Sequence, residues 1–376
     1  MNVLHINSYY PATDLYRQML MMLSLHSKHT HIMYVPVPAD RDVCPRPISD
    51  SRNVRVIYSS DYKYGERWTY NRKRLKIARS IETHLELGDV SVIHAHHLFT
   101  AGGVAYELKR LYGIPFITAV RNTDINWFFR YAFHLRRFGI DILREASKIV
   151  FISPAGLNGL RRYIPHAIWP KIERKSVVIP NGIDAFWLQN PQQRTALVQE
   201  NCVTLLYVGS ITRNKNVEAV ILTGAELVAR GYSVNVLVVG SGPNVERVKR
   251  LAEKTCVNVV MTGHIYDKRK LMDLYRSADV FMMPSFTETF GLVYVEAMSQ
   301  GLPIIYTRGQ GIDGFFEDGA IGYACDPRNY GQMADNILLI MEDYCRFSTQ
   351  CSALAERFSW ADITRLYESI YSQLEP

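Results

Sequence analysis

The sequence predicts an α/β protein with two doubly wound domains, each built on its own parallel sheet. Its 376 residues exceed the roughly 100–200 residues of a typical single domain. Short apolar runs alternate with longer segments of helical pattern, as in βαβ units. A turn signal at Asn181-Gly182 and a polar stretch from Asn190 separate two sets of these runs. We therefore expect a domain boundary near residue 185.

The apolar runs define the predicted strands of each domain. In the first domain, residues 1–185, the strand candidates are Val3–Ile6, His31–Val37, Val54–Tyr58, Val90–Ala95, Pro115–Val120 and Lys148–Ser153. In the second domain, residues 186–359, they are Thr204–Val208, Val234–Val239, Val257–Thr262, Val280–Met283 and Leu302–Tyr306. Each set is large enough for a sheet of its own.

The last segment, residues 360–376, is predicted to form a helix that packs back on the first domain. Apolar residues recur in it at turn-like spacing, from Trp360 and Ile363 to Ile370 and Leu374. Two doubly wound domains on one linker are expected to face each other across a cleft. Open α/β sheets bind ligands beyond the carboxyl ends of their strands, so we expect the active site in that cleft.

Composition excludes several classes of protein. Hydrophobic residues make up 48% and charged residues 21%, which argues against a disordered or fibrous chain. No apolar run approaches the roughly 18–20 residues of a membrane-spanning helix, and the first ten residues lack a signal-peptide pattern. A cytoplasmic location is expected. Six scattered cysteines without a CxxC pair predict reduced, buried thiols rather than disulfides or a zinc site.

Charge is unevenly divided between the two halves. Residues 1–185 hold 26 Lys and Arg against 15 Asp and Glu, a net of +11, whereas residues 186–376 hold 17 against 21, a net of −4. An anionic partner for the first half is expected. Two basic segments contain interleaved aromatic residues, at 61–80 and at 127–138. An anionic membrane, a nucleic acid and an ordinary solvated face remain open as readings of these segments.

The segment Pro284–Pro303 carries the most informative chemistry. It runs from the end of a strand through a loop into a helix, where Gly291 and free N–H groups form a site for an anion. The carboxylates of Glu288 and Glu296 are expected to reach the cleft and accept hydrogen bonds from sugar hydroxyls. Acid and base roles in hydrolysis, or simple helix-start charges, are the alternatives.

Two further loops follow predicted strands of the second domain. The loop Gly209–Asn216 carries Arg213 and Lys215, two cations that suit a diphosphate leaving group or an ordinary solvated loop. The loop Gly240–Pro243 makes a tight turn without the complete GxGxxG spacing, so a nicotinamide cofactor is not indicated.

These segments belong to a longer ordered series of motifs that resembles glycosyltransferase family 4, the retaining GT-B enzymes that use nucleotide sugars. The resemblance covers nearly the whole chain, and the order and spacing of the motifs make it specific. It includes Ile93–His96 with Gly102, Ile179–Asp184, Tyr207–Lys215, Val239–Pro243, Gly263-His264, Ala278–Ser285, Glu288-x7-Glu296 and Phe358–Trp360.

The resemblance implies roles for individual residues. In the family, the first Glu of the Glu-x7-Glu motif engages the donor sugar and the second holds the ribose hydroxyls, which implies these roles for Glu288 and Glu296. Lys215 is implied to bind the diphosphate. The remaining implied donor-binding residues are Gly209, Ser210, Gly242, His264, Ile265, Thr289, Phe290, Gly291 and Leu292.

The chain departs from the family pattern at two places. Ser210 stands where the family often has an arginine, and Arg213 is the candidate replacement for that cation. Arg121 stands where the family has a histidine in His-Gly-x-Asp; its guanidinium stays protonated, so charge stabilisation or positioning is expected. Arg121 is counted with Glu288, Lys215 and Arg213 as a catalytic candidate, whereas His96, Asn122 and Asp124 are assigned to the acceptor side of the cleft. The segment from Arg121 to Asn126 resembles a subgroup of bacterial surface-polysaccharide enzymes.

Metal and cofactor sites are not predicted. His94 and His96 share one face of a strand, but no ligand-spaced carboxylate or cysteine follows. A place in the donor cleft or packing at the strand end is therefore preferred for His96. Asp40-Arg41-Asp42 spells Asp-x-Asp, a pattern that chance easily produces. The cationic loop makes a divalent ion unnecessary for the diphosphate.

The sequence therefore predicts a retaining glycosyltransferase at the inner face of the cell membrane. It is expected to move a sugar from a nucleotide-diphosphate donor, UDP first and GDP second, to a hydroxyl of a lipid-linked glycan in capsule, O-antigen or exopolysaccharide synthesis. The donor motifs favour a membrane over a nucleic acid for the basic aromatic segments. A nucleotide-sugar epimerase and a non-catalytic nucleotide-sugar-binding membrane scaffold are the alternatives.

Overall fold

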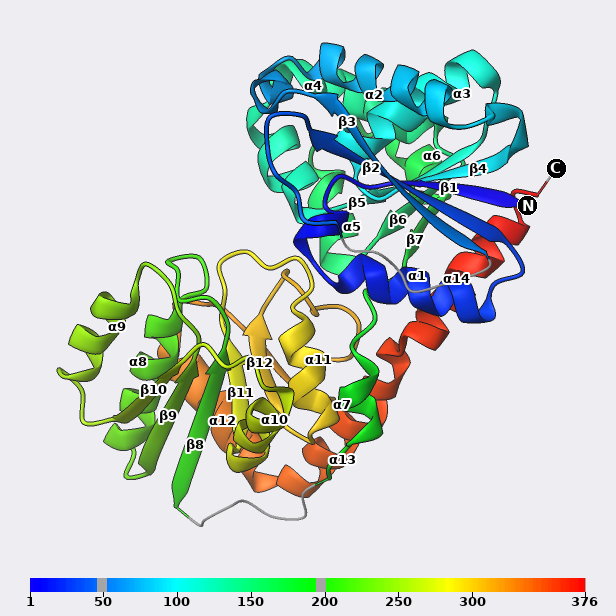
Figure 1. Ribbon diagram of the computed structural model, residues 1–376. Helices are drawn as coiled ribbons and strands as arrows, with labels where there is room; N and C mark the ends of the chain where they lie inside the picture. Colours follow the sequence, from blue (N-terminus) through cyan, green and yellow to red (C-terminus); the bar gives the residue numbers. More distant parts are fainter. Residues whose placement is uncertain (46–52, 194–200, 376) are drawn as a thin grey trace. The chain divides into compact units, whose positions relative to one another are not determined.

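The computed structural model describes residues 1–45, 53–193 and 201–375 (Figure 1). The chain divides into two compact units. Unit 1 comprises Met1–Ile152, Gly156–Gly182 and the C-terminal segment from Trp360, and unit 2 comprises Ser153–Ala155 and Ile183–Ser359. The division after Gly182 lies close to the boundary expected at residue 185.

Unit 1 is built on a seven-stranded parallel sheet in the order β3-β2-β1-β4-β5-β6-β7. The strands are β1 (Asn2–Ile6), β2 (Thr30–Pro38), β3 (Val54–Tyr62), β4 (Val90–Ala95), β5 (Phe116–Val120), β6 (Lys148–Phe151) and β7 (Ser176–Val178). The helices and single turns are η1 (Tyr10–Ala12), α1 (Leu15–His26), η2 (Tyr64–Trp68), α2 (Tyr70–His84), η3 (Leu87–Asp89), η4 (Leu98–Gly102), α3 (Gly103–Tyr112), η5 (Asp124–Phe129), α4 (Phe133–Glu145), α5 (Pro154–Arg161), α6 (Trp169–Glu173) and α14 (Trp360–Ser372).

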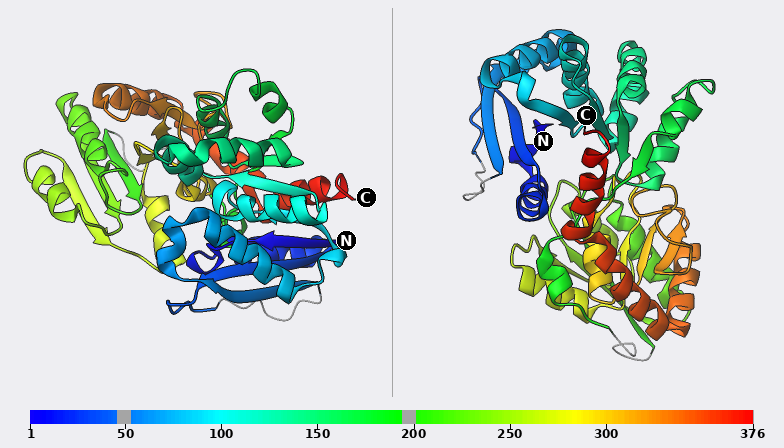
Figure 2. Two further views of the ribbon diagram at one scale, coloured as in Figure 1. Left: turned by 90° about the horizontal axis from the view of Figure 1, so that it is seen from above. Right: turned by 90° about the vertical axis from the view of Figure 1, so that its right-hand side faces the viewer.

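Both faces of this sheet are covered by helices. Alternation along β1 sends Val3 into one apolar core and Leu4 into the other. The first core joins the sheet to α1 and α14, which lie side by side (Figure 2). The Trp360 indole donates to Gln18 Oε1 at 2.9 Å, which fixes the start of α14 on α1. Residues on α2, α3 and α4 form the second core.

Unit 2 is built on a six-stranded parallel sheet in the order β10-β9-β8-β11-β12-β13. The strands are β8 (Cys202–Val208), β9 (Ser233–Val239), β10 (Asn258–Gly263), β11 (Val280–Met283), β12 (Ile304–Thr307) and β13 (Gly322–Cys325). The helices are α7 (Ala185–Gln189), α8 (Val217–Ala229), α9 (Val245–Ala252), α10 (Lys268–Ser277), α11 (Leu292–Ser299), α12 (Tyr330–Glu342), α13 (Tyr344–Ala355) and η6 (Glu356–Phe358).

The sequence located eleven of these strands and missed two. The bounds of β4 and β11 agree with their predictions to the residue. The missed strands, β7 and β13, are edge strands of three and four residues. Neither strand contains more than three consecutive apolar residues, whereas the equally short β11 contains four.

Two expectations about the surface and the thiols can be compared with the structure. Within the described segments, no helix is both long and apolar enough to cross a bilayer. All six cysteines are free, but the prediction that they are buried was wrong for most of them. Only Cys325 and Cys351 are buried, whereas Cys44, Cys256 and Cys345 are exposed.

Candidate active site

The predicted donor-side residues lie on one edge of the unit 2 sheet. They occupy the loops that follow β8, β9, β10 and β11, which are four adjacent strands of the sheet, and the beginning of α11. All four strands are parallel, so their carboxyl ends meet at the same edge. The β8–β11 junction is where the chain order of the strands changes direction, the usual place for a ligand in such a sheet.

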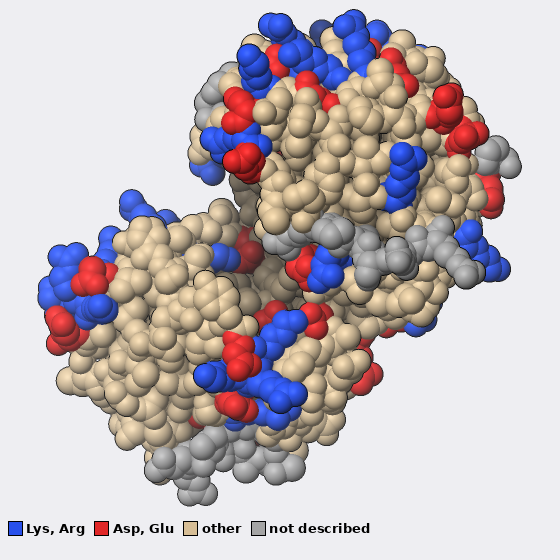
Figure 3. All heavy atoms as spheres, in the orientation of Figure 1, with Lys and Arg blue, Asp and Glu red and all other residues tan. Residues whose placement is uncertain are grey.

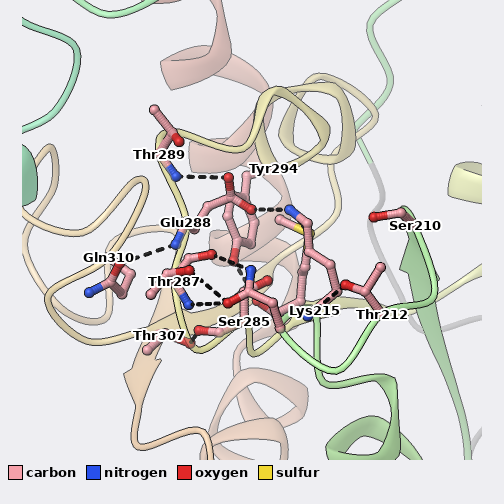
Figure 4. Close-up of polar contacts among 12 residues, drawn as sticks. Ser210, Thr212, Lys215, Ser285, Thr287, Glu288, Thr289, Tyr294, Thr307 and Gln310 are labelled. Atoms are coloured by element: carbon pink, nitrogen blue, oxygen red, sulfur yellow. Dashed lines mark hydrogen bonds and ion pairs between the residues drawn. The ribbon is translucent and has the colours of Figure 1, made fainter. Parts of the chain in front are cut away.

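Lys215 and Glu288 form an ion pair at this junction (Figure 4). Lys215 Nζ lies 2.5 Å from Glu288 Oε2 and also contacts Met283 Sδ at 3.9 Å. The side chains remain 23% and 10% exposed, so the pair is shielded but still reachable by a ligand. A cation and an acceptor carboxylate are thus held side by side at the sheet edge.

The backbone around Glu288 is fixed by neighbouring loops. Glu288 N donates to Gln310 Oε1 at 3.1 Å, and Thr289 N donates to Glu288 Oε1 at 2.9 Å (Figure 4). Asn214 Oδ1 accepts from both the backbone N and the hydroxyl of Thr287. The Lys215 loop and the Glu288 loop are therefore joined before any ligand binds.

Gly291 allows the turn from this loop into α11. Its φ of 81° lies in the left-handed region, and a Cβ there would lie 2.5 Å from the Tyr294 ring. Tyr294 in turn donates its hydroxyl to Met283 O at 2.6 Å, which anchors the first turn of α11 to β11. Phe290 is buried, whereas Leu292 is partly exposed at the start of the helix.

Glu296, one turn further along α11, is partly buried. It accepts a hydrogen bond from the Tyr275 hydroxyl at 3.1 Å. Burial raises the pKa of Glu296 to about 7, while Tyr275 and Lys268 partly oppose that rise. Lys268 is itself paired with Asp184. Glu296 is therefore poised between its neutral and charged forms near neutral pH.

The glycine-rich loops after β8 and β9 pack tightly on each other. A Cβ on Gly242 would lie 2.3 Å from Ile211 O, so only glycine permits this approach. Gly209 N donates to Val239 O at 2.9 Å, and the Ser210 carbonyl accepts from the Tyr207 hydroxyl at 2.9 Å. Gly242 thus shapes the loop pair.

His264 and Ile265 follow the edge strand β10. His264 is exposed and its ring meets that of Tyr266 edge to face at 4.3 Å. Ile265 is partly exposed. Both residues border the same sheet edge without a recorded contact to the Lys215–Glu288 pair.

Arg213 is not part of that pair. It lies on the same loop as Lys215 but lines a hollow whose wall contains neither Lys215 nor Glu288. The two predicted diphosphate cations therefore have different neighbours in the structure.

The predicted acceptor-side residues lie in unit 1, at the carboxyl ends of β4 and β5. Asp124 is 2% exposed, and its carboxylate accepts from the backbone N–H groups of Arg121, Leu98 and Phe99 at 2.8–3.2 Å. Burial raises the pKa of Asp124 to about 6 against the opposing effect of those hydrogen bonds. Its carboxylate holds two loops together, rather than standing open to an acceptor.

Arg121 is also largely buried. Its guanidinium donates to the His96 carbonyl and to Asn181 Oδ1, each at 3.2 Å, and lies 5.8 Å from the centre of the Tyr16 ring. Asn122 accepts a hydrogen bond from Asn126. Arg121 thus spans the ends of several strands as a positioning group.

His96 belongs to a buried cluster of imidazoles that the sequence only partly revealed. His5 Nδ1 lies 3.0 Å from His96 Nε2, and His5 Nε2 lies 3.0 Å from His31 Nδ1. His94 Nδ1 lies 2.7 Å from the Tyr371 hydroxyl of α14. Burial is the main cause that lowers the pKa of each of the four, to about 3 for His31 and His94.

The same cluster contains the residues that could hold a metal ion. Nitrogens of His5, His94 and His96 lie within 4.8 Å of one another. Across the described parts of the chain, no other set of three His, Cys, Asp or Glu side chains comes close enough. The two acids of Asp40-Arg41-Asp42 are not among them.

Comparison with known proteins identifies the family. A model described as "Glycosyltransferase Family 4" matches residues 22–185, and one described as "Glycosyl transferases group 1" matches residues 189–358. The chain is a family 4-type glycosyltransferase. The resemblance noted in the sequence is thereby confirmed.

Solved structures show the GT-B fold for this glycosyltransferase. Sucrose-phosphate synthase from Thermosynechococcus elongatus is similar with a TM-score of 0.77 and 20% identity, over 100% of this chain and 99% of that one. Anabaena HepE, solved in complex with UDP and glucose, has a TM-score of 0.68 and 16% identity over 99% of each chain.

The named relatives differ in activity. A D-inositol 3-phosphate glycosyltransferase from Arthrobacter sp. (strain FB24) is 28% identical over 68% of this chain and 63% of that protein. An alpha-monoglucosyldiacylglycerol synthase from Streptococcus pneumoniae is 23% identical over 74% of this chain and 64% of that protein. These matches span slightly less than two thirds of each relative.

Several site residues of the glycosyltransferase were missed by sequence reasoning. Asn216 donates its amide to Pro284 O at 3.1 Å and to Pro327 O at 2.9 Å, which joins three loops. Gln310 holds the Glu288 backbone, and Tyr275 holds the Glu296 carboxylate. Position in a loop directly after a predicted strand was the available signal for Asn216 and Gln310.

The two basic aromatic segments of the glycosyltransferase differ. In 61–80, Arg74 pairs with Glu107 and Lys76 with Glu66, so part of the charge is neutralised. The side chains of Arg67 and Trp68 lie outside the described residues. In 127–138, large aromatic groups are exposed, at 47% for Trp127, 58% for Tyr131 and 65% for Phe133. The second segment is the better candidate for a membrane contact.

Proposed function

We propose that this enzyme transfers a sugar from a nucleotide-diphosphate donor to a hydroxyl group of a lipid-linked glycan, with retention of configuration. The observation that carries the proposal is the Lys215–Glu288 pair at the β8–β11 junction, beside the start of α11. Together they offer a cation, a carboxylate and helix N–H groups, which suit a diphosphate joined to a sugar.

Stabilisation of the leaving diphosphate is the main contribution to catalysis. As the bond between the sugar C1 and the phosphate oxygen breaks, negative charge grows on the diphosphate, where Lys215 and the α11 N-terminus stabilise it. Glu288 then accepts hydrogen bonds from the sugar hydroxyls. The acceptor oxygen forms the new bond to C1 from the face that the diphosphate leaves. Its proton passes to the leaving phosphate oxygen, so no enzymic nucleophile is required.

Glu296 is assigned to the ribose of the donor. Its ionised carboxylate can accept from two vicinal hydroxyls, and its position on α11 follows the loop that holds Glu288. UDP is the proposed nucleotide, with GDP second. HepE is solved with UDP and glucose, which supports UDP here by analogy.

The proposal assigns the diphosphate charge to Lys215 and helix N–H groups, with no divalent ion. Addition of a chelator such as EDTA is therefore expected to leave the transfer rate unchanged. Loss of transfer that returns on addition of Mg²⁺ or Mn²⁺ would contradict this part of the proposal.

A membrane contact is proposed for residues 127–138 of unit 1. Trp127, Tyr131 and Phe133 are exposed, and Arg130 and Arg136 stand over the Tyr131 and Phe133 rings at 5.2 and 4.4 Å. Aromatic rings beside cations suit the headgroup region of an anionic bilayer. Peripheral binding to the inner membrane face, and a role in capsule, O-antigen or exopolysaccharide synthesis, follow from this assignment together with the sequence resemblance.

Calorimetry tests the donor site first. Wild-type protein is titrated with UDP, GDP and ADP, and the titrations are repeated with Glu296→Ala and with Glu317→Gln, an exposed carboxylate outside the site. Selective binding that weakens in the first variant alone supports the site. No binding of any nucleotide by folded wild-type protein would contradict it.

A turnover assay separates the remaining functions. Membrane lipid extract is supplied with the bound donor, and products are separated chromatographically. A sugar joined to a lipid acceptor supports transfer. Donor rearrangement without acceptor would indicate an epimerase, and binding without any turnover over a broad acceptor panel would indicate a scaffold.

A further inference from the structure

A polar hollow lies in unit 2, and Lys215, Glu288 and Glu296 are not part of its lining. It has a volume of about 670 Å³, within the range of small-molecule pockets. Its wall combines side chains of α8 and α9 with the loop after β11 and the start of α12. The lining residues are Arg213, Asn216, Glu218, Leu222, Arg247, Arg250, Leu251, Lys254, Phe286, Arg328 and Tyr330.

The wall of this hollow is strongly cationic. Five of its residues are Lys or Arg, against one carboxylate, Glu218, which Arg247 already pairs at 2.9 Å. Residues 186–376 hold 17 Lys and Arg against 21 Asp and Glu and are therefore net negative. The excess of positive charge in the wall of the hollow is thus opposite in sign to the net charge of this half of the chain. Lys and Arg gather over α9 on this face (Figure 3). A small anion would find several guanidinium groups able to bind its oxygens in pairs.

The wall also offers aromatic and aliphatic surface. Phe286 and Tyr330 stand among the cations, and the Arg328 guanidinium lies 5.3 Å from the centre of the Phe286 ring. Leu222 and Leu251 contribute apolar area. Aromatic faces beside phosphate-binding guanidinium groups suit a ligand that joins a phosphate to a ring, and a simple inorganic ion would leave this surface unused.

We infer that this hollow is a binding site for a phosphate monoester carried on a small polar group, of the sugar-phosphate class. The site is separate from the donor site, and it takes Arg213 as one of its own cations. The source of the phosphate can be a free sugar phosphate or a phosphorylated lipid headgroup, since both present the same dianionic or monoanionic oxygens.

The hollow shares a loop with the donor site. Arg213 and Asn216 face the hollow, whereas Lys215, between them in sequence, is paired with Glu288. Phe286 N donates to Asn214 O at 2.8 Å, which links the far wall to the same loop. A ligand held by Arg213 therefore acts on the segment that positions Lys215, so occupancy of the hollow is expected to change donor affinity or turnover.

Calorimetry with glucose 6-phosphate tests the site. The test variant is Arg250→Glu with Lys254→Glu, which reverses two charges that lie outside the donor site. The control is Lys249→Glu on the same helix, because Lys249 pairs with Glu246 and does not line the hollow. Saturable binding of glucose 6-phosphate is expected, about tenfold or more weaker in the double variant and unchanged in the control.

Two further measurements distinguish this site from the donor site and identify the source of the phosphate. Glu296→Ala is expected to lose UDP binding and keep glucose 6-phosphate binding, which separates failure of the donor site from failure of this one. Sedimentation with phosphatidic acid vesicles, which present a phosphate monoester, against phosphatidylcholine vesicles, assigns the source to a lipid headgroup if it depends on Arg250 and Lys254. Equal binding by the double variant and the wild type, or no saturable binding to any probe, overturns the inference.

Discussion

In both units, polar residues lie at the carboxyl edge of a parallel sheet, but the exposure and the partners of these residues differ. In unit 2, Lys215 and Glu288 are 23% and 10% exposed and are paired with each other. In unit 1, Asp124 is 2% and Arg121 7% exposed, and both bind backbone groups. The contrast indicates that unit 2 presents its charges to a ligand, whereas unit 1 uses its charges to fix loop positions.

The difference extends to the groups behind each edge. Behind the edge of the unit 2 sheet lies the carboxylate of Glu296. Its pKa is raised to about 7, so it changes charge near neutral pH. Unit 1 places imidazoles whose pKa is lowered, to about 3 for His31 and His94, so they are neutral at any ordinary pH. Four predictions test this difference between the units.

The largest effect is expected on turnover in unit 2. Lys215→Ala removes the cation at the leaving diphosphate and should lower kcat by about 10²–10³-fold. Steady-state kinetics with a saturating donor measures it, with Lys249→Ala as the matched surface control. Near-normal transfer by Lys215→Ala would contradict its role.

Asp124 should matter for stability in unit 1. Asp124→Ala leaves three backbone N–H groups without their carboxylate and should lower the free energy of unfolding by about 3 kcal/mol. Urea unfolding measures this change. Asp124→Asn, which keeps one acceptor oxygen, should lose less. If Asp124→Ala instead unfolds like wild type while transfer is lost, Asp124 contacts the acceptor directly.

Acid should destabilise unit 1 through its imidazoles. Because the pKa of His31 and His94 is about 3 in the folded protein and near 6.5 in the unfolded chain, the unfolded state binds more protons between these values. Stability is then lost as pH falls below about 6.5. Asp124, with its pKa raised from 3.8 to about 6, opposes this loss between those two values.

The loss of stability caused by the imidazoles should exceed the opposing effect of Asp124, because several imidazoles contribute and Asp124 is a single residue. We expect the free energy of unfolding to fall by about 2 kcal/mol from pH 6 to pH 5. His94→Gln should make this slope shallower by about 1 kcal/mol per pH unit, whereas the exposed His134→Gln should not. Identical slopes in the two variants would argue against a neutral buried cluster.

The smallest effect is expected on nucleotide affinity. The proposed role of Glu296 is to bind ribose hydroxyls as a carboxylate, and its pKa in the free protein is raised to about 7. Affinity for UDP should therefore weaken as pH falls below 7, by up to about tenfold per pH unit. Glu296→Gln should bind weakly at every pH, and calorimetry at pH 5, 6, 7 and 8 measures both proteins. A pH-independent wild-type affinity would remove Glu296 from the ribose site.

Sequence reasoning located most strands because each buried strand leaves a continuous apolar run. It located Glu288 and Lys215 because both follow such runs directly. It did not find their supports, because the hydrogen bonds from Glu288 to Gln310 and from Asn216 to Pro284 join positions far apart in the chain. Local periodicity carries no signal for such contacts.

The same limit explains the differences in unit 1. His96 and Asp124 were visible as polar residues at strand ends, but only the paired register of β1 and β4, which sets His5 opposite His94, reveals the imidazole cluster. Burial of Asp124 depends on two backbone amides from another loop. A polar residue after a strand is thus ambiguous between ligand binding and loop support until its neighbours are known.

The strand order of unit 2 has a consequence for how such an enzyme can diverge. Lys215 follows β8 and Glu288 follows β11, and these strands are neighbours although β9 and β10 come between them in the chain. Insertions or exchanges within β9, α9 and β10 lengthen the chain between the two residues without separating them. New specificity for the nucleotide or for an effector can therefore arise in that segment while the Lys215–Glu288 pair is inherited intact.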